Sequence, residues 1–170
     1  PRRRKRRGFF DRITSVMGFS KTNVPDCDNC PAKTNCLSRF MDKASYKSWK
    51  LLRSAKSFGK TDLVFSEGGT PPGLFIICKG SVKICTTSAD GHQLISRIEK
   101  AGDMIGHIAL LAEGEFHANA EVLETSVISL IDRELFHKFL REHPGVSIAL
   151  MRALARDIRA GDSKARDIAY

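Results

Sequence analysis

Short runs of Val, Ile, Leu and Phe recur between residues 62 and 132, and turns that contain glycine interrupt them. Asp90-Gly91 is typical of a hairpin turn, because an Asp–Gly pair readily adopts the positive φ angles that such a turn needs. Many short strands separated by regular turns indicate a closed or sandwiched β architecture. We therefore predict a mainly β core, with strands at residues 63–65, 74–78, 82–87, 93–98, 118–123 and 126–131.

Helical patterns flank this core. Residues 37–58 mix apolar residues with Lys and Arg, and they predict a helix that lies against the core, with Trp49 as a packing residue. A short helix is predicted from Asp132 to the His143-Pro144-Gly145 stop. These helices leave the β strands as the centre of the domain.

A long helix is predicted from Val146 onward. Apolar or small residues recur there at alternating spacings of three and four, which is the seam pattern of a two-stranded coil. The seam residues are Met151, Leu154, Ile158, Gly161, Ala165 and Ile168. We predict that this helix forms a dimer interface, and the alternative is an amphipathic helix that packs on its own domain.

Several segments together resemble the β-roll of the Crp/Fnr regulators, the cyclic-nucleotide-binding domain. They are EGG at 67–69, LFIICKGSVKI, DGHQLI, AGDMIGHIALLAEG and ANAEVLETS, and they follow in the family's order. The resemblance covers Cys27 to Tyr170. It implies a double-stranded β-helix, a jelly-roll or cupin-like β-roll, with flanking helices and a long C-terminal helix that forms the homodimer. We expect a basic, partly amphipathic arm at 1–24, the β-roll domain with a cysteine segment at 25–143, and the dimerisation helix at 144–170.

The same resemblance implies where a nucleotide would bind. In cyclic-nucleotide-binding members a Glu takes the ribose hydroxyl, and an Arg followed by a small hydroxyl residue holds the phosphate beside a short helix. His107 stands here in place of the Glu, and His117-Ala118 stands in place of the Arg pair. We predict that cyclic AMP and cyclic GMP are not physiological ligands. The degenerate pocket would comprise Gly106, His107, Ile108, Ala109, His117 and Ala118; the histidines either meet another anion or a haem, or, as we favour, are ordinary packed or surface residues.

Three cysteines in the spacing C-x2-C-x5-C, Cys27, Cys30 and Cys36, are close enough to share one metal ion or cluster. The motif is similar to that of the oxygen sensor Fnr, which binds a four-iron four-sulfur cluster, but the family's fourth cysteine falls on Ser129 here. Strand cysteines are more often small buried hydrophobes than ligands. An iron-sulfur cluster, zinc and free thiols all remain open, with a fourth ligand to come from Cys78, Cys85, Asp26 or Asp28.

The charge is concentrated at one end of the chain. Of the formal net charge of +9, six units come from Arg2, Arg3, Arg4, Lys5, Arg6 and Arg7, and the remainder carries only +3. Phe9 and Ile13 lie on one face of a short amphipathic pattern that follows. This arm either contacts an anionic membrane surface or nucleic acid, or is a solvated tail that docks on its own domain. The chain shows no secretory signal and no membrane-spanning run, and we predict a cytoplasmic protein.

No catalytic constellation is visible, so we predict a protein that is not an enzyme. The sequence favours a dimeric signal-sensing module that passes an effector or redox signal through its C-terminal helix. Regulation of transcription would then require a DNA-binding domain, because the sequence contains no helix-turn-helix after the long helix. The alternative is a standalone adaptor that docks an unknown protein partner, or a membrane surface, through its β-roll and basic arm.

Overall fold

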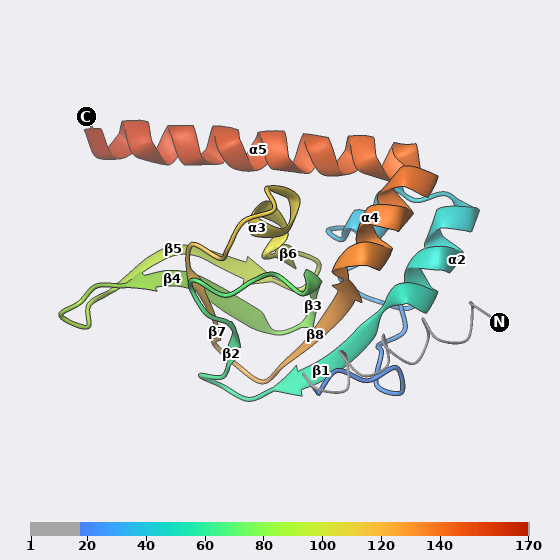
Figure 1. The fold of residues 1–170 in the computed structure, drawn as a ribbon, viewed down its shortest axis with the longest axis horizontal. Coiled ribbons are helices and arrows are strands. Elements are labelled where there is room, and N and C mark those ends of the chain that lie inside the picture. Colours follow the sequence, from blue (N-terminus) through green and yellow to red (C-terminus); the bar gives the residue numbers. More distant parts are fainter. Residues whose placement is uncertain (1–17, 170) are drawn as a thin grey trace.

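The computed structural model describes the backbone of residues 18–169 and the side chains of residues 18–159 and 161. Two four-stranded antiparallel sheets form a β-roll, with helices beside it and a C-terminal helix that runs past it (Figure 1). The predicted fold class is therefore confirmed. The basic arm, Arg2 to Arg7, and the amphipathic pattern beside it lie outside the described residues.

Consecutive strands lie in different sheets, except that β4 and β5 pair with each other in the second sheet. The first sheet has the order β1-β8-β3-β6 and the second has the order β2-β7-β4-β5. The strands are β1 (Ser54–Phe58), β2 (Leu63–Phe65), β3 (Gly73–Lys79), β4 (Ser81–Thr87), β5 (Gln93–Lys100), β6 (Met104–Ile105), β7 (Asn119–Val122) and β8 (Ser126–Asp132). The helices are η1 (Leu37–Phe40), α2 (Lys43–Leu52), α3 (His107–Leu111), α4 (Arg133–Glu142) and α5 (Pro144–Ala169).

The first sheet is buried on both faces, and this explains the unbroken apolar run of β3. Side chains alternate across a strand, so Phe75 and Ile77 belong to the core inside the roll. Leu74 and Ile76 belong to a second core that lies under the helices, together with Trp49. The first sheet thus separates two hydrophobic cores, and the helices and the cysteine segment cover its outer face.

The prediction of one helix over residues 37–58 was wrong in its second part. Helix α2 begins after Asp42, whose side chain accepts a hydrogen bond from the Ser45 backbone N–H, and it ends at Leu52. Residues 54–58 instead form the edge strand β1, which pairs with β8 from Ser54 opposite Leu130 to Phe58 opposite Ser126. The open edge of β8 satisfies the backbone of this segment, so a long-range pairing overrides its local pattern.

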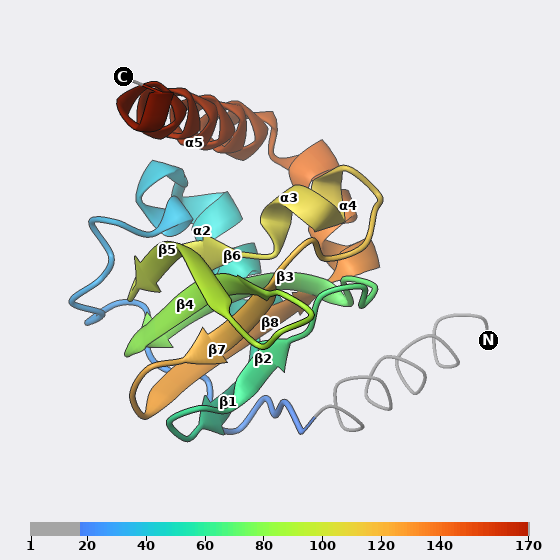
Figure 2. The ribbon, with the colours of Figure 1, turned by 90° about the vertical axis from the view of Figure 1, so that its left-hand side faces the viewer.

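Two helices complete the domain. Asp132 caps α4 by accepting hydrogen bonds from the backbone N–H groups of Glu134 and Leu135. Pro144 begins α5, where a missing N–H costs no helical hydrogen bond. Figures 1 and 2 show α5 passing over α3 and alongside the roll. Among the described residues, no helix combines the length and the apolar character that crossing a bilayer requires.

Candidate functional site

Four cysteines from two distant parts of the chain line one small cavity. Cys27, Cys30 and Cys36 come from the turns before η1, and Cys78 comes from the end of β3. The cavity has a volume of about 20 Å³. Cys85 is fully buried in the second sheet and takes no part. The structure therefore brings the three predicted cysteines together and adds one of the two strand cysteines to them.

Local contacts hold the cysteine segment against the roll. Asp28 forms an ion pair of 2.8 Å with Lys50 of α2, and Asp26 accepts hydrogen bonds from residues 28 and 29. Both carboxylates are exposed and engaged outside the cavity. The turn at Gly102 lies against the segment so closely that a Cβ there would stand 3.0 Å from the Ala32 carbonyl oxygen. The cysteine segment is thus docked through specific contacts. The carboxylates of Asp26 and Asp28 bind residues outside the cavity.

A buried arginine stands among the thiols. Arg53, only 3% exposed, donates hydrogen bonds from Nη1 to Cys27 Sγ, from Nη2 to Cys78 Sγ at 3.2 Å and from Nε to Ser129 Oγ at 3.2 Å. None of the ion pairs among residues 18–159 includes Arg53. A buried cation normally needs an anionic partner. Sequence reasoning missed Arg53, because its partners are 25 to 76 residues away along the chain.

The geometry of the cavity tests whether its residues fit the metal groups that the cysteine motif implies. Burial raises the pKa of the Cys27 thiol, and the Arg53 guanidinium opposes this rise. Among the side chains that the structure describes, no three ligand groups converge at metal-binding distances, because Arg53 stands between Cys27 and Cys78. A volume of about 20 Å³ has room for one ion of roughly the size of a water molecule. A four-iron cluster does not fit these residues as they stand.

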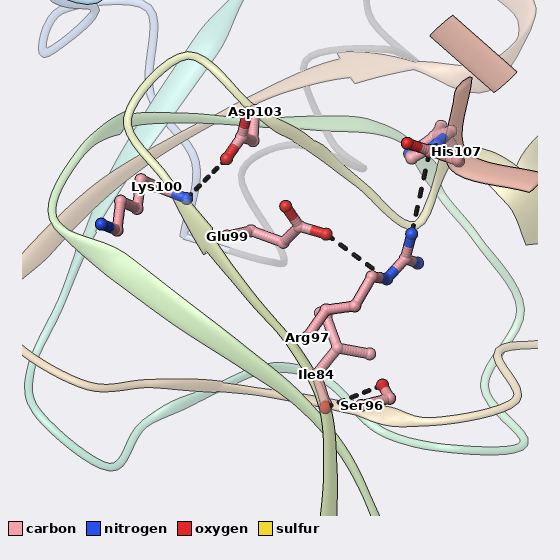
Figure 3. A network of polar contacts seen from close by, with 8 residues as sticks. Ile84, Ser96, Arg97, Glu99, Lys100, Asp103 and His107 are labelled. Carbon is pink, nitrogen blue, oxygen red and sulfur yellow. Dashed lines mark hydrogen bonds and ion pairs between the residues drawn. The ribbon is translucent and has the colours of Figure 1, made fainter. Parts of the chain in front are cut away.

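A second polar site links α5 to the roll. His107 begins α3 and is buried, and its Nε2 lies 3.2 Å from Oδ2 of Asp157 in α5. Arg97 of β5 lies 3.7 Å from the same Asp157 oxygen and 3.4 Å from Oε1 of Glu99. Figure 3 shows Arg97 reaching from β5 toward His107, with Glu99 on its other side. A neighbouring cavity of about 200 Å³ is lined by further charged residues, among them Arg39, Asp103 and Arg156.

Aromatic rings fill the interior of the roll beside Gly106, which belongs to the predicted nucleotide pocket. Gly106 precedes α3 with a φ of 73°, and a Cβ there would stand 2.8 Å from the Phe116 ring. Phe116 is buried and stacks on Phe65, with ring centroids 3.8 Å apart. His117 is exposed, Ala118 is half-buried, and in α3 Ile108 is exposed and Ala109 is buried. The six predicted pocket residues thus lie at the start of α3 and in the loop before β7, and they differ in exposure.

Helix α5 presents an apolar stripe to solvent. Ile148, Met151 and Ile158 are 47%, 58% and 66% exposed, and Ala155 between them is also exposed. Leu154, which the seam pattern includes, instead packs against the core under the helices. Gly161 is exposed, whereas the side chains of Ala165 and Ile168 lie outside the described residues. The open stripe thus follows 148, 151, 155 and 158, spaced by three and four residues.

The contact between His107 and Asp157 has a predicted pH dependence. The hydrogen bond from His107 lowers the pKa of Asp157 from its ordinary value of 3.8, and burial opposes this. A carboxyl group whose pKa is lower in the folded than in the unfolded state stabilises the fold above the unfolded value, and this contribution is lost as the pH falls through the folded value. We expect Asp157→Asn to lower the free energy of unfolding at neutral pH, and the deficit to shrink below about pH 4.

Urea unfolding of both proteins across the acid range measures this difference. Glu115→Gln, a change at an exposed carboxylate, is the control and should show no pH-dependent deficit. A deficit for Asp157→Asn that stays constant from neutral pH to about pH 3 would contradict the assignment.

Comparison with known proteins places this geometry in a family. The family model "Cyclic nucleotide-binding domain" matches residues 55–143. The "CRP-like cAMP-activated global transcriptional regulator" of Mycobacterium tuberculosis is 29% identical over 114 residues, covering 66% of this chain and 50% of that protein. The "Fumarate and nitrate reduction regulatory protein" of Vibrio cholerae is 24% identical over 140 residues, covering 81% of this chain and 55% of that protein.

The fold comparison agrees with these relatives. The crystal structure of the Catabolite Activator Protein of Thermus thermophilus superposes with a TM-score of 0.70 at 22% identity, over 78% of this chain and 62% of that one. The chain spans about half the length of the two curated relatives, and the match lies in their sensory part. These relatives are regulators of transcription by name, so the prediction that the domain is not an enzyme is confirmed. Since the family match extends over more than half of its length, the chain belongs to the family of cyclic nucleotide-binding domains.

Proposed function

We propose that this chain is the sensory part of a dimeric transcriptional regulator that does not use cyclic AMP as its effector. The observation that carries the proposal is the contact between His107 and Asp157. His107 occupies the position of the ribose-binding Glu, yet its ring is buried at 3.2 Å from a carboxylate of α5. The start of α3, where a nucleotide would bind, therefore contacts α5, the helix that would transmit the signal. No nucleotide is needed between them.

Two further features support a pocket without nucleotide affinity. The Phe116 ring lies against Gly106, at the start of α3, where the phosphate would approach the backbone. The exposed His117 stands in place of the Arg that would pair with the phosphate charge. Without that charge-assisted pair, a buried phosphodiester anion has no neutralising partner. The site thus lacks the charged partner that the phosphate of cyclic AMP requires, and Phe116 lies close to the turn that the phosphate would approach.

The exposed stripe of α5 supports signal transmission through a dimer. Large apolar side chains spaced by three and four residues on one helix face are the usual seam between two helices. Beside this stripe, Leu154 packs against the core under the helices, and Asp157 contacts His107 of α3. One helix therefore joins the sensory roll to a second copy, so a change at α3 or β5 shifts how the two helices pair. The output is regulation of transcription by the remainder of the regulator.

Isothermal titration calorimetry with cyclic AMP and cyclic GMP tests this proposal. We expect no binding heat up to about 1 mM nucleotide, which corresponds to a binding free energy weaker than about −4 kcal/mol. The regulator of M. tuberculosis, named as cAMP-activated, is the positive control. The double variant His107→Glu/His117→Arg should also remain silent, because Phe116 still fills the space at Gly106. A Kd tighter than about 100 µM for the unmodified protein would overturn the proposal.

A further inference from the structure

The cavity of about 200 Å³ lies between α5 and the outer side of the first sheet. Residues in and before η1, the turn from β5 to β6, and α5 all line it. Leu37 and Met104 in this lining pack in the core under the helices, whereas Phe116 belongs to the core inside the roll. Of the six predicted pocket residues, His107 alone lines the cavity. This cavity is therefore distinct from the place where the family resemblance puts a nucleotide.

The charged side chains of the cavity balance each other. Three carboxylates accompany three guanidinium groups in and beside it: Glu99, Asp103 and Asp157 with Arg39, Arg97 and Arg156. With histidine counted as neutral, a ligand that carries a net charge would leave one charge without a partner in a partly enclosed space, which is costly. A ligand with one positive and one negative group keeps the balance.

Both kinds of charge keep unused hydrogen-bonding capacity. Arg39 donates from Nη1 to a backbone carbonyl oxygen at 2.7 Å, and a guanidinium has five N–H donors. Among residues 18–159, neither Arg39 nor Arg156 forms an ion pair with a carboxylate. Asp103 accepts one backbone hydrogen bond through Oδ2, at 2.7 Å, and its Oδ1 bonds to no described residue. The lining thus offers donors for an anionic group and an acceptor for a cationic one.

From this arrangement we infer that the cavity binds a free α-amino acid with a short apolar side chain. Arg39 and Arg156 hold the carboxylate of the amino acid, and Asp103 accepts hydrogen bonds from its ammonium group. His107 is buried, and its Nδ1 has no hydrogen-bond partner among the described residues. Buried polar atoms are nearly always paired, so a ligand that donates to this nitrogen would complete the site.

The size and the remaining lining of the cavity support this class of ligand. A cavity of about 150 Å³ takes a benzene-sized molecule, whereas pockets for drug-sized ligands usually have about 300–1,000 Å³. A volume of about 200 Å³ therefore suits a small amino acid. Phe40, Met104 and Ala153 supply apolar surface for its side chain.

The regulatory meaning of this site rests on the proposed function. Ala153, Arg156 and Asp157 of α5 form one wall of the cavity, and the turn from β5 to β6 forms another. An amino acid between these walls contacts the roll and the helix together. It would favour one position of α5 on the roll and so bias how two copies pair.

Isothermal titration calorimetry of the full chain with L-leucine and L-valine measures binding. Two analogues of leucine separate the charges: isocaproate lacks the ammonium group, and isoamylamine lacks the carboxylate. We expect one leucine per chain with a Kd below about 1 mM. Each analogue should bind at least about 10-fold more weakly, because each loses a charge-assisted set of hydrogen bonds.

Matched variants locate the site. Arg156→Gln and Asp103→Asn should each weaken leucine binding about 10- to 100-fold, the usual range for a hydrogen bond to a charged group. Arg152→Gln is the control, because residue 152 is also exposed on α5, one turn earlier, and does not line the cavity. Ala153→Phe should abolish binding by filling the space. Circular dichroism verifies that each variant is folded.

Three outcomes would overturn the inference: no binding heat with either amino acid, an analogue that binds as tightly as leucine, or unchanged affinity in both Arg156→Gln and Asp103→Asn. The two proposals fail separately. A chain that ignores both cyclic AMP and the amino acids would refute the amino acid site alone. A chain that binds leucine in this cavity and also binds cyclic AMP would refute the proposed function alone.

Discussion

Ile158→Asp is expected to convert the proposed dimer into monomers at micromolar chain concentrations. Ile158 is 66% exposed on the stripe that also contains Ile148 and Met151. In a two-helix seam the substitution would bury two unpaired carboxylates, one from each copy, and uncompensated buried charge costs several kcal/mol. Each 1.4 kcal/mol is a tenfold change in Kd, so the dimer should weaken by at least about 100-fold.

Sedimentation velocity or light scattering over a concentration series measures the change. Arg156→Asp is the control, because it also introduces an aspartate at an exposed residue of α5, two positions before Ile158 and therefore near the opposite face of the helix. The control should dissociate far less than Ile158→Asp, and circular dichroism should show equal helix content in both. Two variants with the same dimer affinity would place the interface on another face of the protein.

Trp49→Ala is expected to lower the free energy of unfolding by about 3–5 kcal/mol, the usual cost of removing a large buried aromatic side chain. Trp49 of α2 is fully buried, and its ring centroid lies 5.6 Å from that of Phe139 in α4. It also lines the small cavity that contains Cys27, Cys30, Cys36 and Cys78. The substitution therefore leaves a void between the cysteine segment and the helices that lead into α5.

Urea unfolding monitored by circular dichroism gives the size of this effect. Leu51→Ala lies in the same helix, two residues further on, and removes a side chain that is 70% exposed. Surface changes of this kind usually stay within about 0.5 kcal/mol. Similar losses for both variants would mean that Trp49 does not anchor the second core.

The hydrophobic pattern predicted most of the β-roll, because short apolar runs separated by glycine turns are typical of its strands. It did not predict β1, since Ser54 and Lys56 interrupt the apolar pattern and only the edge of β8 makes that segment a strand. The family resemblance identified the position of His107. It could not identify Asp157, which lies 50 residues away and reaches His107 only because α5 crosses α3.

The cysteine spacing predicted a shared site, but the other side chains of that site carry no local signal. Arg53 is an ordinary basic residue after a helix in the sequence, and only the folded sheet places it between Cys27 and Cys78. Similarly, Phe116 is one of ten phenylalanines, and its closeness to Gly106 depends on the path of the loop after α3. Such contacts depend on tertiary packing rather than on spacing along the chain.

The pairing of β1 and β3 with β8 also determines when the cavity lined by the four cysteines forms during protein synthesis. Strand β8 lies about seventy residues after β1, and Arg53 meets Ser129 across 76 residues. Long-range strand pairing folds slowly, since distant segments must be brought together first. Cys27, Cys30 and Cys36 therefore leave the ribosome well before the strands that enclose them. Until residue 132 has emerged these thiols remain open to solvent, so a newly made chain passes through a period in which oxidation competes with folding.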